Sequence, residues 1–424
     1  MLIDLWHEAL ARDDHPPEDF LRQVMASGAV YGGAPLCVHR RPHFISAATV
    51  KGLARNLSLF HGAIRRLRGG VEEQGLRGDL VQSLRLEPDA LELASIHPGY
   101  ESASLISRVD CFAGPEGPRF LELNAESPAG IAYADAMTEV FERDPIRARF
   151  NHLTRFRSTD TVVRAVLETW KDWGGVGQPR VAVVDFQDVP TQPEFVLFRQ
   201  RFLAHGIPCT VADPRALEWD GQRLRHEGQT IEVVYRRLLV RDILDRPDAC
   251  RALLEAYRAG AVCMVNSLRT PLLHGKALFA LLHSPSLQRT LTRAQQRMVR
   301  DCIPFTSLAT DAARDEAALD RERWVLKPIH GHGGQGVVLG HEVDQANWEA
   351  ALQRADRHIL QHRVPEHRAL FPDARDGYAL KDCLVDLDPF LVRGRLTGFL
   401  CRISEGALAN VAAGAGQVPV YVSP

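Results

Sequence analysis

The sequence has no long hydrophobic run, no close pair of cysteines and almost no excess of charge, and each absence excludes a class of protein. None of its apolar stretches approaches the 18 or so residues that a membrane-spanning helix needs. Its 51 basic and 53 acidic side chains give a net charge of -2, which offers no general electrostatic attraction to nucleic acid or to an anionic membrane. We therefore expect neither as a partner.

The cysteines are too scattered to form a framework. All eight are spread along the 424 residues, and none forms a Cys-x-x-Cys pair, so cysteine-based metal sites and disulfide scaffolds are not expected. The N-terminal stretch MLIDLWHEALARDD carries acidic residues and lacks the basic-then-apolar pattern of a secretion signal. Together these features predict a soluble protein of the reducing cytoplasm.

What the sequence does contain is a series of regions with different character, as a chain of this length permits. Residues 1–100 predict a mainly helical N-terminal region. Within it, the segment 46–67 predicts one helix, because its apolar residues recur every three or four positions. That face consists of Val50, Leu53, Leu57, Phe60, Ile64 and Leu67. A packing helix is the interpretation that this pattern favours.

Residues 175–268 predict a small parallel α/β domain, entered through a glycine-rich linker at 170–180. Strands separated by a helix at this spacing favour a parallel sheet. No G-x-G-x-x-G motif follows the first strand, so dinucleotide binding is unsupported. The helix is expected at 193–204 and the strands at 180–186, 209–214 and 231–242. Further helices are expected at 275–284 and 290–301.

The stretch WVLKPIHGHGGQGVVLG, residues 324–340, predicts two strands joined by a glycine-rich loop. It lacks the Gly-Lys-Ser/Thr ending of a Walker loop. Glycines let backbone N–H groups approach an anion closely, and Lys327 comes just before them, which favours a flap that folds over a triphosphate. A plain hairpin turn is the alternative. The glycines are Gly331, Gly333, Gly334 and Gly336.

Histidines in or beside this loop raise a second possibility, a metal site. His330, His332 and His341 are the candidates. We favour this interpretation less, because a loop of this kind spaces its ligands poorly and no acidic residue or cysteine completes the set.

The stretch SRVDCFAGPEGPRFLELNAESPAG predicts a β-hairpin, with GPEG as its turn. If the turn is centred on Glu116, Asp110 faces Glu122 and Arg108 faces Asn124. All four side chains then lie on one face, because side chains alternate along a strand. The opposite, core-facing side would carry Val109, Cys111, Leu121 and Leu123.

Two carboxylates placed opposite each other repel unless a cation lies between them. Asp110, Glu122 and Asn124 offer only oxygen ligands, the set that suits Mg²⁺ shared with substrate phosphates. One alternative is a solvated face whose charges are paired by Arg108 and Arg119. Another is the carboxylate dyad of a glycoside hydrolase, for which so close a pair is less suited.

These motifs resemble those of a known family. R-x-D at 108–110 and E-x-N at 122–124 resemble the metal-binding hairpin of glutathionylspermidine synthases and other circularly permuted ATP-grasp proteins. VLKPIHGHGGQGV resembles the glycine-rich phosphate flap of ATP-grasp enzymes. In most ATP-grasp enzymes the E-x-N motif follows the flap. Here it precedes the flap by some two hundred residues, the order that a circular permutation produces.

The resemblance implies a circularly permuted ATP-grasp fold of the mixed α/β (α+β) class. The hairpin and a following helix would occupy residues 101–150, residues 175–268 would form the domain that precedes ATP-grasp folds, and residues 269–424 would form the nucleotide-binding region. Asp110, Glu122 and Asn124 would hold one or two Mg²⁺ ions on ATP.

Further residues follow from the same resemblance. Lys276 and Lys327 would neutralise phosphate oxygens, and the loop glycines would cover them. The backbone from Gln361 to Val364 would contact adenine. Arg108 would stabilise the transferring phosphoryl group and Arg402 would contact phosphate, while Asn410 would lie near the metal or the triphosphate.

The activity that the resemblance implies is ATP-dependent ligation of a small-molecule carboxylate to an amine through an acyl phosphate. The alternatives are a phosphotransferase that stops at a phosphorylated product and an ATP-binding scaffold without chemistry. Arg236, Arg237 and Arg241 could meet a second carboxylate, although a salt-bridged or solvated strand end is the favoured interpretation. The sequence names neither the two substrates nor the oligomeric state.

Overall fold

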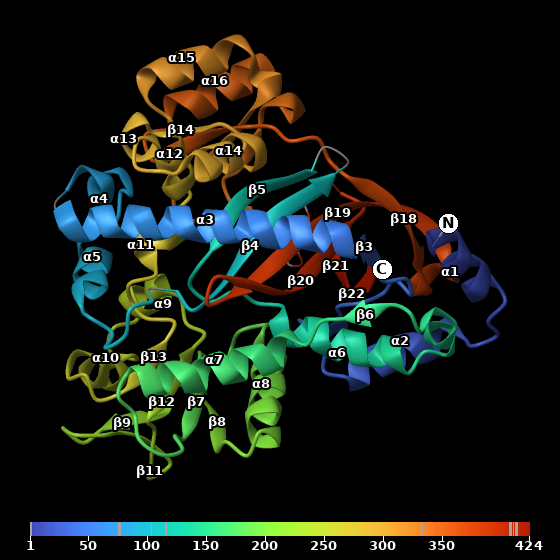
Figure 1. Ribbon diagram of the computed structural model, residues 1–424, viewed down its shortest axis with the longest axis horizontal. Helices are drawn as coiled ribbons and strands as arrows, with labels where there is room; N and C mark the ends of the chain where they lie inside the picture. Colours follow the sequence, from blue (N-terminus) through green and yellow to red (C-terminus); the bar gives the residue numbers. More distant parts are fainter. Residues whose placement is uncertain are drawn as a thin grey trace.

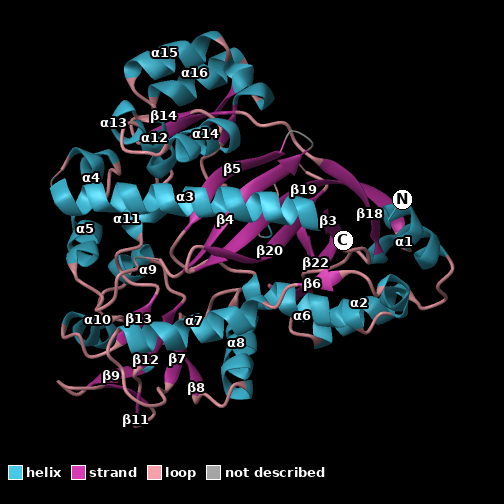
Figure 2. Ribbon diagram, viewed as in Figure 1, coloured by secondary structure: helices cyan, strands magenta, loops and turns pink. Residues whose placement is uncertain are grey.

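The computed structural model describes residues 2–74, 78–102, 104–114, 117–331, 334–406, 409, 411 and 414–424. A central antiparallel sheet lies between a parallel α/β unit and a smaller sheet covered by helices (Figures 1 and 2). No helix in the described part of the chain combines the length and the apolar character needed to span a membrane. The mixed α/β class is therefore confirmed.

The central sheet is built from two distant stretches of the chain. Its order is β21-β20-β19-β4-β5, with β18 also paired to β19, and every pairing is antiparallel. The predicted hairpin thereby lies beside strands from the C-terminal region. The strands are β4 (Ile106–Gly114), β5 (Gly117–Asn124), β18 (Arg368–Asp373), β19 (Ala379–Val392), β20 (Arg395–Ser404) and β21 (Gly416–Val418).

Helix α3 (Ala47–Gln74) crosses one face of this sheet (Figure 1). The apolar face predicted for it is confirmed, since five of its six residues are buried and Val50 packs half-buried against the same core. The ring of Phe60 lies 5.7 Å from that of Phe120 and 5.8 Å from that of Phe279. Burial of these rings fastens α3 to the hairpin and to helix α12 (Ala277–His283).

The first hundred residues are mainly helical, as expected, with a few short strands. Strand β3 pairs in parallel with β22, which also pairs with β6, so the N-terminal region and the C-terminal end of the chain share one sheet. The helices are α1 (Leu2–Ala11), α2 (Pro17–Ala26), α4 (Asp79–Ser83) and α5 (Pro88–Ser95), and the strands β1 (Val30–Tyr31), β2 (Ala34–Pro35), β3 (His43–Ser46), β6 (Thr154–Arg155) and β22 (Val420–Ser423).

The predicted parallel sheet is confirmed, with the order β13-β12-β7-β8. The strand expected at 231–242 is too long, because it ends at Arg236 and helix α9 begins at Val240. The carboxylate of Asp242 accepts a hydrogen bond from the Leu239 N–H and helps to start that helix. The strands are β7 (Val181–Val184), β8 (Cys209–Ala212), β12 (Val233–Arg236) and β13 (Cys263–Val265).

Helices cover both faces of this parallel sheet, and a small sheet of order β11-β10-β9 adjoins it. The helices α6 and α7 connect it to the hairpin. The elements are α6 (Ile131–Glu142), α7 (Ser158–Asp172), α8 (Gln192–Ala204), α9 (Val240–Asp245), α10 (Arg251–Arg258), β9 (Leu217–Trp219), β10 (Leu224–His226) and β11 (Gln229–Thr230).

The smaller sheet has the order β14-β17-β15-β16 and is antiparallel throughout. The strands predicted on either side of the glycine loop are β15 and β16, and the predicted helices are α12 and α14. Two further helices, α15 and α16, cover the sheet (Figure 1). The elements are β14 (Thr306–Leu308), β15 (Trp324–Pro328), β16 (Val338–Leu339), β17 (His358–His362), α11 (Pro271–His274), α13 (Pro285–Gln288), α14 (Arg293–Cys302), α15 (Asp311–Leu319) and α16 (Gln345–Gln353).

Replacing Phe60 by alanine tests the contribution of α3. The ring is fully buried, so the substitution is expected to lower the free energy of unfolding by about 3–5 kcal/mol. Urea unfolding followed by tryptophan fluorescence measures the loss. Leu319→Ala, at a side chain that is 89% exposed, is the control and should stay within about 0.5 kcal/mol of the wild type. Equal stabilities for the two variants would contradict this account of the core.

Candidate functional site

A cavity of about 220 Å³ lies between the central sheet and the smaller antiparallel sheet. Side chains from both sequence motifs line it, although the motifs are far apart along the chain. Gly336 lies in the adjoining turn, whereas His332, Gly333 and Asn410 lie outside the described residues. The predicted residues at the cavity are Arg108, Asp110, Glu122, Asn124, Lys276, Lys327, Gly331, Gly334, Gln361, Val364 and Arg402.

The hairpin has the predicted register where the charged side chains lie. Asp110 is opposite Glu122, and Arg108 is opposite Asn124. All four line the cavity. The turn itself, where Glu116 was expected at the centre, lies outside the described residues.

A β-bulge changes the register nearer the turn. Between Asp110 and Cys111 the pairing shifts, so Cys111 faces Phe120. The prediction that Leu121 belongs to the core is therefore wrong. One extra residue reverses the faces of a strand, which turns Leu121 to the cavity and buries Phe120 in the core beside Val109, Cys111 and Leu123.

Asp110 lies at the centre of a network of charges. It accepts hydrogen bonds from Arg108 Nε (2.9 Å), from Asn124 Nδ2 (2.7 Å) and from Arg402 Nη2 (2.8 Å). Burial raises the pKa of Asp110, but the two guanidinium groups outweigh burial and hold that pKa below its usual range. Asp110 is therefore a carboxylate at neutral pH.

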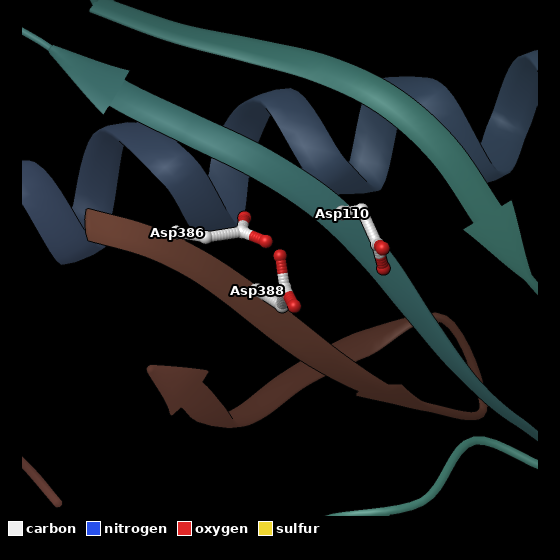
Figure 3. Close-up of side chains that lie close together, drawn as sticks. All are labelled: Asp110, Asp386 and Asp388. Carbon is white, nitrogen blue, oxygen red and sulfur yellow. The ribbon is translucent and has the colours of Figure 1, made fainter. Parts of the chain in front are cut away.

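Two further acids, Asp386 and Asp388 on β19, were missed by the sequence reasoning. Figure 3 shows their carboxyl groups directed toward the same space as that of Asp110 on the neighbouring strand β4. Each of the three residues has an oxygen within 4.8 Å of the others. The clue was available in LVDLDPF, where two charges two residues apart interrupt an apolar strand, which is the pattern that identified Glu122.

One nitrogen occupies the middle of these three carboxylates. Arg402 Nη2 lies 2.8 Å from Asp110, 2.5 Å from Asp386 and 2.9 Å from Asp388. Burial raises the pKa of Asp388, and the charge of Arg402 acts against that rise. The three acids therefore surround a guanidinium group, and a metal ion among them would have to displace it.

The two predicted lysines approach the cavity from the other side. Lys276 Nζ lies 3.2 Å from a carboxylate oxygen of Glu122 and donates to the carbonyl of Gly331 (2.8 Å). Lys327 Nζ donates to Oε1 of Gln361 (2.6 Å), whose amide in turn donates to Thr306 (3.0 Å). Both ammonium groups are thus held at the cavity by groups that anionic oxygens could replace.

The glycine loop joins β15 to β16, which pair antiparallel as predicted. Gly334 and Gly336 have φ angles of +75° and +72°, a conformation that favours glycine. The N–H of Val337 closes the turn on the carbonyl of Gly334 (3.2 Å). Residues 334–337 therefore form a tight turn beside the cavity.

A histidine metal site is not formed by the described residues. The His330 ring is hydrogen-bonded to the backbone carbonyl of Arg85 (3.0 Å), whereas His341 lines the cavity. Among the described side chains, three or more potential histidine, cysteine or acidic ligands come together only at Asp110, Asp386 and Asp388.

The hairpin residues fit the magnesium ion that the resemblance implies. Asp110, Glu122 and Asn124 present oxygen atoms from one face to one cavity, and hard oxygen donors suit Mg²⁺. The carboxylates lie beside basic side chains to which phosphate oxygens would bind. As to the alternative of a solvated face, Arg108 does pair with Asp110, but Arg119 donates to the backbone carbonyl of Asp301.

The three arginines at and beyond the end of β12 are occupied by structural contacts. Arg236 is fully buried and donates to the carbonyl of Asn266 (3.0 Å), and Arg237 pairs with the buried Glu194 (3.0 Å). Arg241 forms an exposed pair with Asp245. These contacts agree with the salt-bridged interpretation.

The comparison with protein families decides the assignment. The model for circularly permuted ATP-grasp type 2 proteins matches residues 90–412. The chain belongs to this family. Its order of motifs, with the hairpin before the flap, is the order that the permutation predicts, and the predicted circularly permuted ATP-grasp fold is confirmed.

Curated relatives of this ATP-grasp protein are longer than it is. A Frankia casuarinae protein that carries the provisional name glutamate–cysteine ligase 2-2 is 26% identical over 72% of the chain, which spans 36% of that relative. An uncharacterised Mycobacterium tuberculosis protein is 25% identical over 72% of the chain, which spans 57% of it. The chain therefore covers only part of the length of these relatives.

A solved structure supports the fold. The glutathione synthetase-like effector of Globodera pallida superposes with a TM-score of 0.62, at 12% identity, over 96% of this chain and 98% of that one. At such low identity the likeness concerns the fold alone. The more specific likeness to glutathionylspermidine synthase stays a prediction.

Nucleotide affinity is expected to depend on pH through Lys327. Burial, together with the charge of Lys276, lowers the pKa of Lys327 to about 8, while Glu122 acts against the shift. The ammonium form, which attracts phosphate, prevails below pH 8 and is lost above it. Affinity for a nonhydrolysable ATP analogue should therefore fall as the pH rises through 8, by up to about tenfold per unit.

Isothermal titration between pH 7 and 9.5 measures this dependence. The analogue is chosen so that its terminal phosphate keeps a last pKa of about 6, and the charge of the phosphates is then nearly constant in this range. Lys327→Arg keeps its charge throughout and is expected to bind with little pH dependence. An unchanged pH profile in that variant would show that another group titrates.

Proposed function

We propose that this protein binds Mg-ATP in the cavity and uses it to join a carboxylate to an amine. One observation carries the proposal: the R-x-D/E-x-N hairpin and the lysine-bearing glycine flap, far apart in sequence, line the same cavity. The hairpin offers oxygen ligands and arginines, and the flap side offers ammonium groups. This is the set of groups that phosphoryl transfer from a nucleotide requires.

The nucleotide would lie with its base against β17 and its phosphates under the flap. The N–H groups of His362 and Arg363 already donate to the carbonyls of Phe305 and Arg323 (both 2.8 Å). The backbone at Val364, half-buried beside the cavity, is therefore our candidate for the contact with adenine. Lys276 and Lys327 would exchange their present acceptors for phosphate oxygens.

The metal ligands would be Asp110, Glu122 and Asn124. Magnesium bound there would supply positive charge against the phosphate oxygens. When Lys276 transfers its contact from Glu122 to a phosphate, that carboxylate becomes available as a ligand. Binding of the nucleotide and formation of the metal site would thus support each other.

The arginines would act on the reacting groups. A substrate carboxylate oxygen would attack the γ-phosphorus, forming a new O–P bond while the bond to the ADP oxygen breaks. An amine would then attack the carbonyl carbon of the acyl phosphate, and inorganic phosphate would leave as the amine loses a proton. Arg108, at the end of the cavity beside Asp110, is placed to stabilise the negative charge of the phosphoryl group during transfer.

Hydroxylamine trapping tests the reaction class. With Mg-ATP and a screen of amino acid, polyamine and short-peptide substrates, a ligase releases ADP and forms a hydroxamate. Glutamate with cysteine is the first pair to test, because of the provisional name of the Frankia relative. ADP release with a stable phosphorylated product would instead indicate a phosphotransferase, and nucleotide binding without ADP release across the screen would contradict the ligase.

Glu122→Gln is expected to abolish Mg-dependent ADP release, because the change removes one of the two carboxylate charges that would attract the magnesium ion. The fold should persist, as monitored by circular dichroism and by the melting temperature. Glu218→Gln, an exposed residue on strand β9, makes the same chemical change away from the cavity and should behave as the wild type. An active Glu122→Gln enzyme would contradict the assignment of Glu122 as a metal ligand.

Arg108→Ala is expected to lower kcat by a factor on the order of 10²–10³, because it removes a charge that acts on the transferring group. Arg119→Ala, on the partner strand of the same hairpin and directed to Asp301, is the matched control. Steady-state ADP release at saturating ATP gives both values. Normal turnover in Arg108→Ala would mean that Arg108 has only a structural role.

A further inference from the structure

Arg108, Asp110, Asp386, Asp388 and Arg402 form what we call the charge cluster. Asp388 is its one member that no ligand can reach. Its side chain is fully buried under the cavity floor, whereas Asp110 and Asp386 line the cavity itself. Its two oxygens have different tasks. Oδ1 accepts a hydrogen bond from the backbone N–H of Cys111 (3.0 Å), and Oδ2 lies 2.9 Å from Arg402 Nη2 and 3.5 Å from Arg108 Nε.

The contact with Cys111 fixes the direction of this carboxylate. The ladder between β19 and β4 runs from Val392–Ile106 to Phe390–Arg108 and then ends. Beyond it the side chain of Asp388 replaces the backbone as the acceptor for β4, next to the bulge. Because Oδ1 is held there, Oδ2 must face the two arginines.

The arginines need such a group. Arg108 and Arg402 are two positive charges on the same side of the cavity. The charge of Arg402 acts to lower the pKa of Arg108, while Asp110 and Asp388 raise it. Like charges repel strongly where water is scarce. A buried carboxylate that contacts both guanidinium groups offsets this repulsion.

We propose that Asp388 is a positioning residue that holds Arg108 and Arg402 side by side, facing the reacting phosphoryl group. The inference rests on the proposed function, because the paired arginines matter to catalysis only if phosphoryl chemistry takes place in the cavity. The contact by which Asp388 holds the two arginines is a property of the protein alone. It can therefore be measured with or without turnover.

Asp388→Asn separates the two tasks of the residue. The amide oxygen can still accept from Cys111, but the group facing the arginines becomes an NH₂ donor, which repels them. At saturating ATP we expect kcat for ADP release to fall about 10- to 100-fold, with KM for ATP changed less than about twofold, as for an interaction made mainly in the transition state. Asp382→Asn, at an exposed residue of the same strand that pairs with Arg368 (2.9 Å), is the matched control and should leave both constants unchanged.

A double-variant cycle tests whether Asp388 acts through Arg402. In an Arg402→Ala background, Asp388→Asn should lower kcat by a smaller factor than in the wild type, because the shorter of its two contacts is already gone and only the one to Arg108 remains. Wild-type kcat in Asp388→Asn, or an equal loss in both backgrounds, would overturn the proposal.

A measurement independent of activity tests whether Asp388 holds the two guanidinium groups in place. In protein labelled with ¹⁵N-arginine, the signals of the groups that face Asp388, Arg108 Nε–H and Arg402 Nη2–H, should exchange slowly with water and are assigned with lysine variants. In Asp388→Asn this exchange should quicken at least about tenfold, because released guanidinium groups open to solvent more often. Unchanged exchange overturns the proposal even if the enzyme is active. Faster exchange in a protein that shows no ADP release supports the holding and contradicts only the proposed function.

A folding defect in Asp388→Asn has its own test. The double variant Asp388→Asn/Arg402→Gln removes both charges and keeps the bond to Cys111. Recovery of the wild-type Tm in the double variant supports the charge contact, because a buried guanidinium group that has lost one of its carboxylate partners is what destabilised the single variant. Failure of both variants to fold overturns the proposal in favour of a purely structural tie.

Discussion

The cavity depends on the pairing of β4 with β19. Three residue pairs, from Phe390–Arg108 to Val392–Ile106, join a hairpin near the start of the matched region to strands near its end. Without this ladder, Asp110 and Glu122 would share a sheet only with each other. With it, Asp386, Asp388 and Arg402 come to the same face, and the smaller sheet can close over them. The acids and arginines to which we assign chemistry are brought to one face by that long-range contact.

Charge is concentrated at this junction in a way that burial alone would oppose. Taking an isolated carboxylate or guanidinium group out of water is costly, and the cost is offset only when each charge meets a partner. Here Arg402 meets three carboxylates, Arg108 meets two, and Lys276 meets Glu122. Each of these charges thus already faces an opposite charge within the protein. A nucleotide must therefore exchange partners with it, and the lysines, at the end nearest the flap, are the groups best placed to do so.

The permuted order of the chain has little consequence for this arrangement. A sheet is defined by which strands are adjacent, and β4 would lie beside β19 whichever of them came first. What the order changes is the position of the ends. The early strand β3 and the last described strand β22 pair in parallel, so an N-terminal and a C-terminal segment share one sheet, and the described residues of neither strand line the cavity.

The sequence by itself determined the features that depend on near neighbours. These include the buried face of α3, the pairing of Asp110 with Glu122 and of Arg108 with Asn124, the two strands around the glycine loop, and the family. Periodicity and turn chemistry encode them within a few residues. The prediction from side-chain alternation was wrong at Leu121, because a β-bulge adds one residue to the strand and the alternation pattern does not reveal it.

Only the tertiary structure decided which distant charges meet. Asp386 and Asp388 carry the same sequence pattern as Glu122, but nothing local indicates that they surround Arg402 or that Asp388 also contacts Arg108. Likewise, the sequence places Lys276 and Lys327 near phosphate, while the structure adds that Glu122 and Gln361 hold them. Such contacts follow from strand order and from the packing of one sheet on another. The sequence thus determined the parts of the site, and the pairing of β4 with β19 determined their partners, because side-chain contacts between distant strands depend on the whole fold.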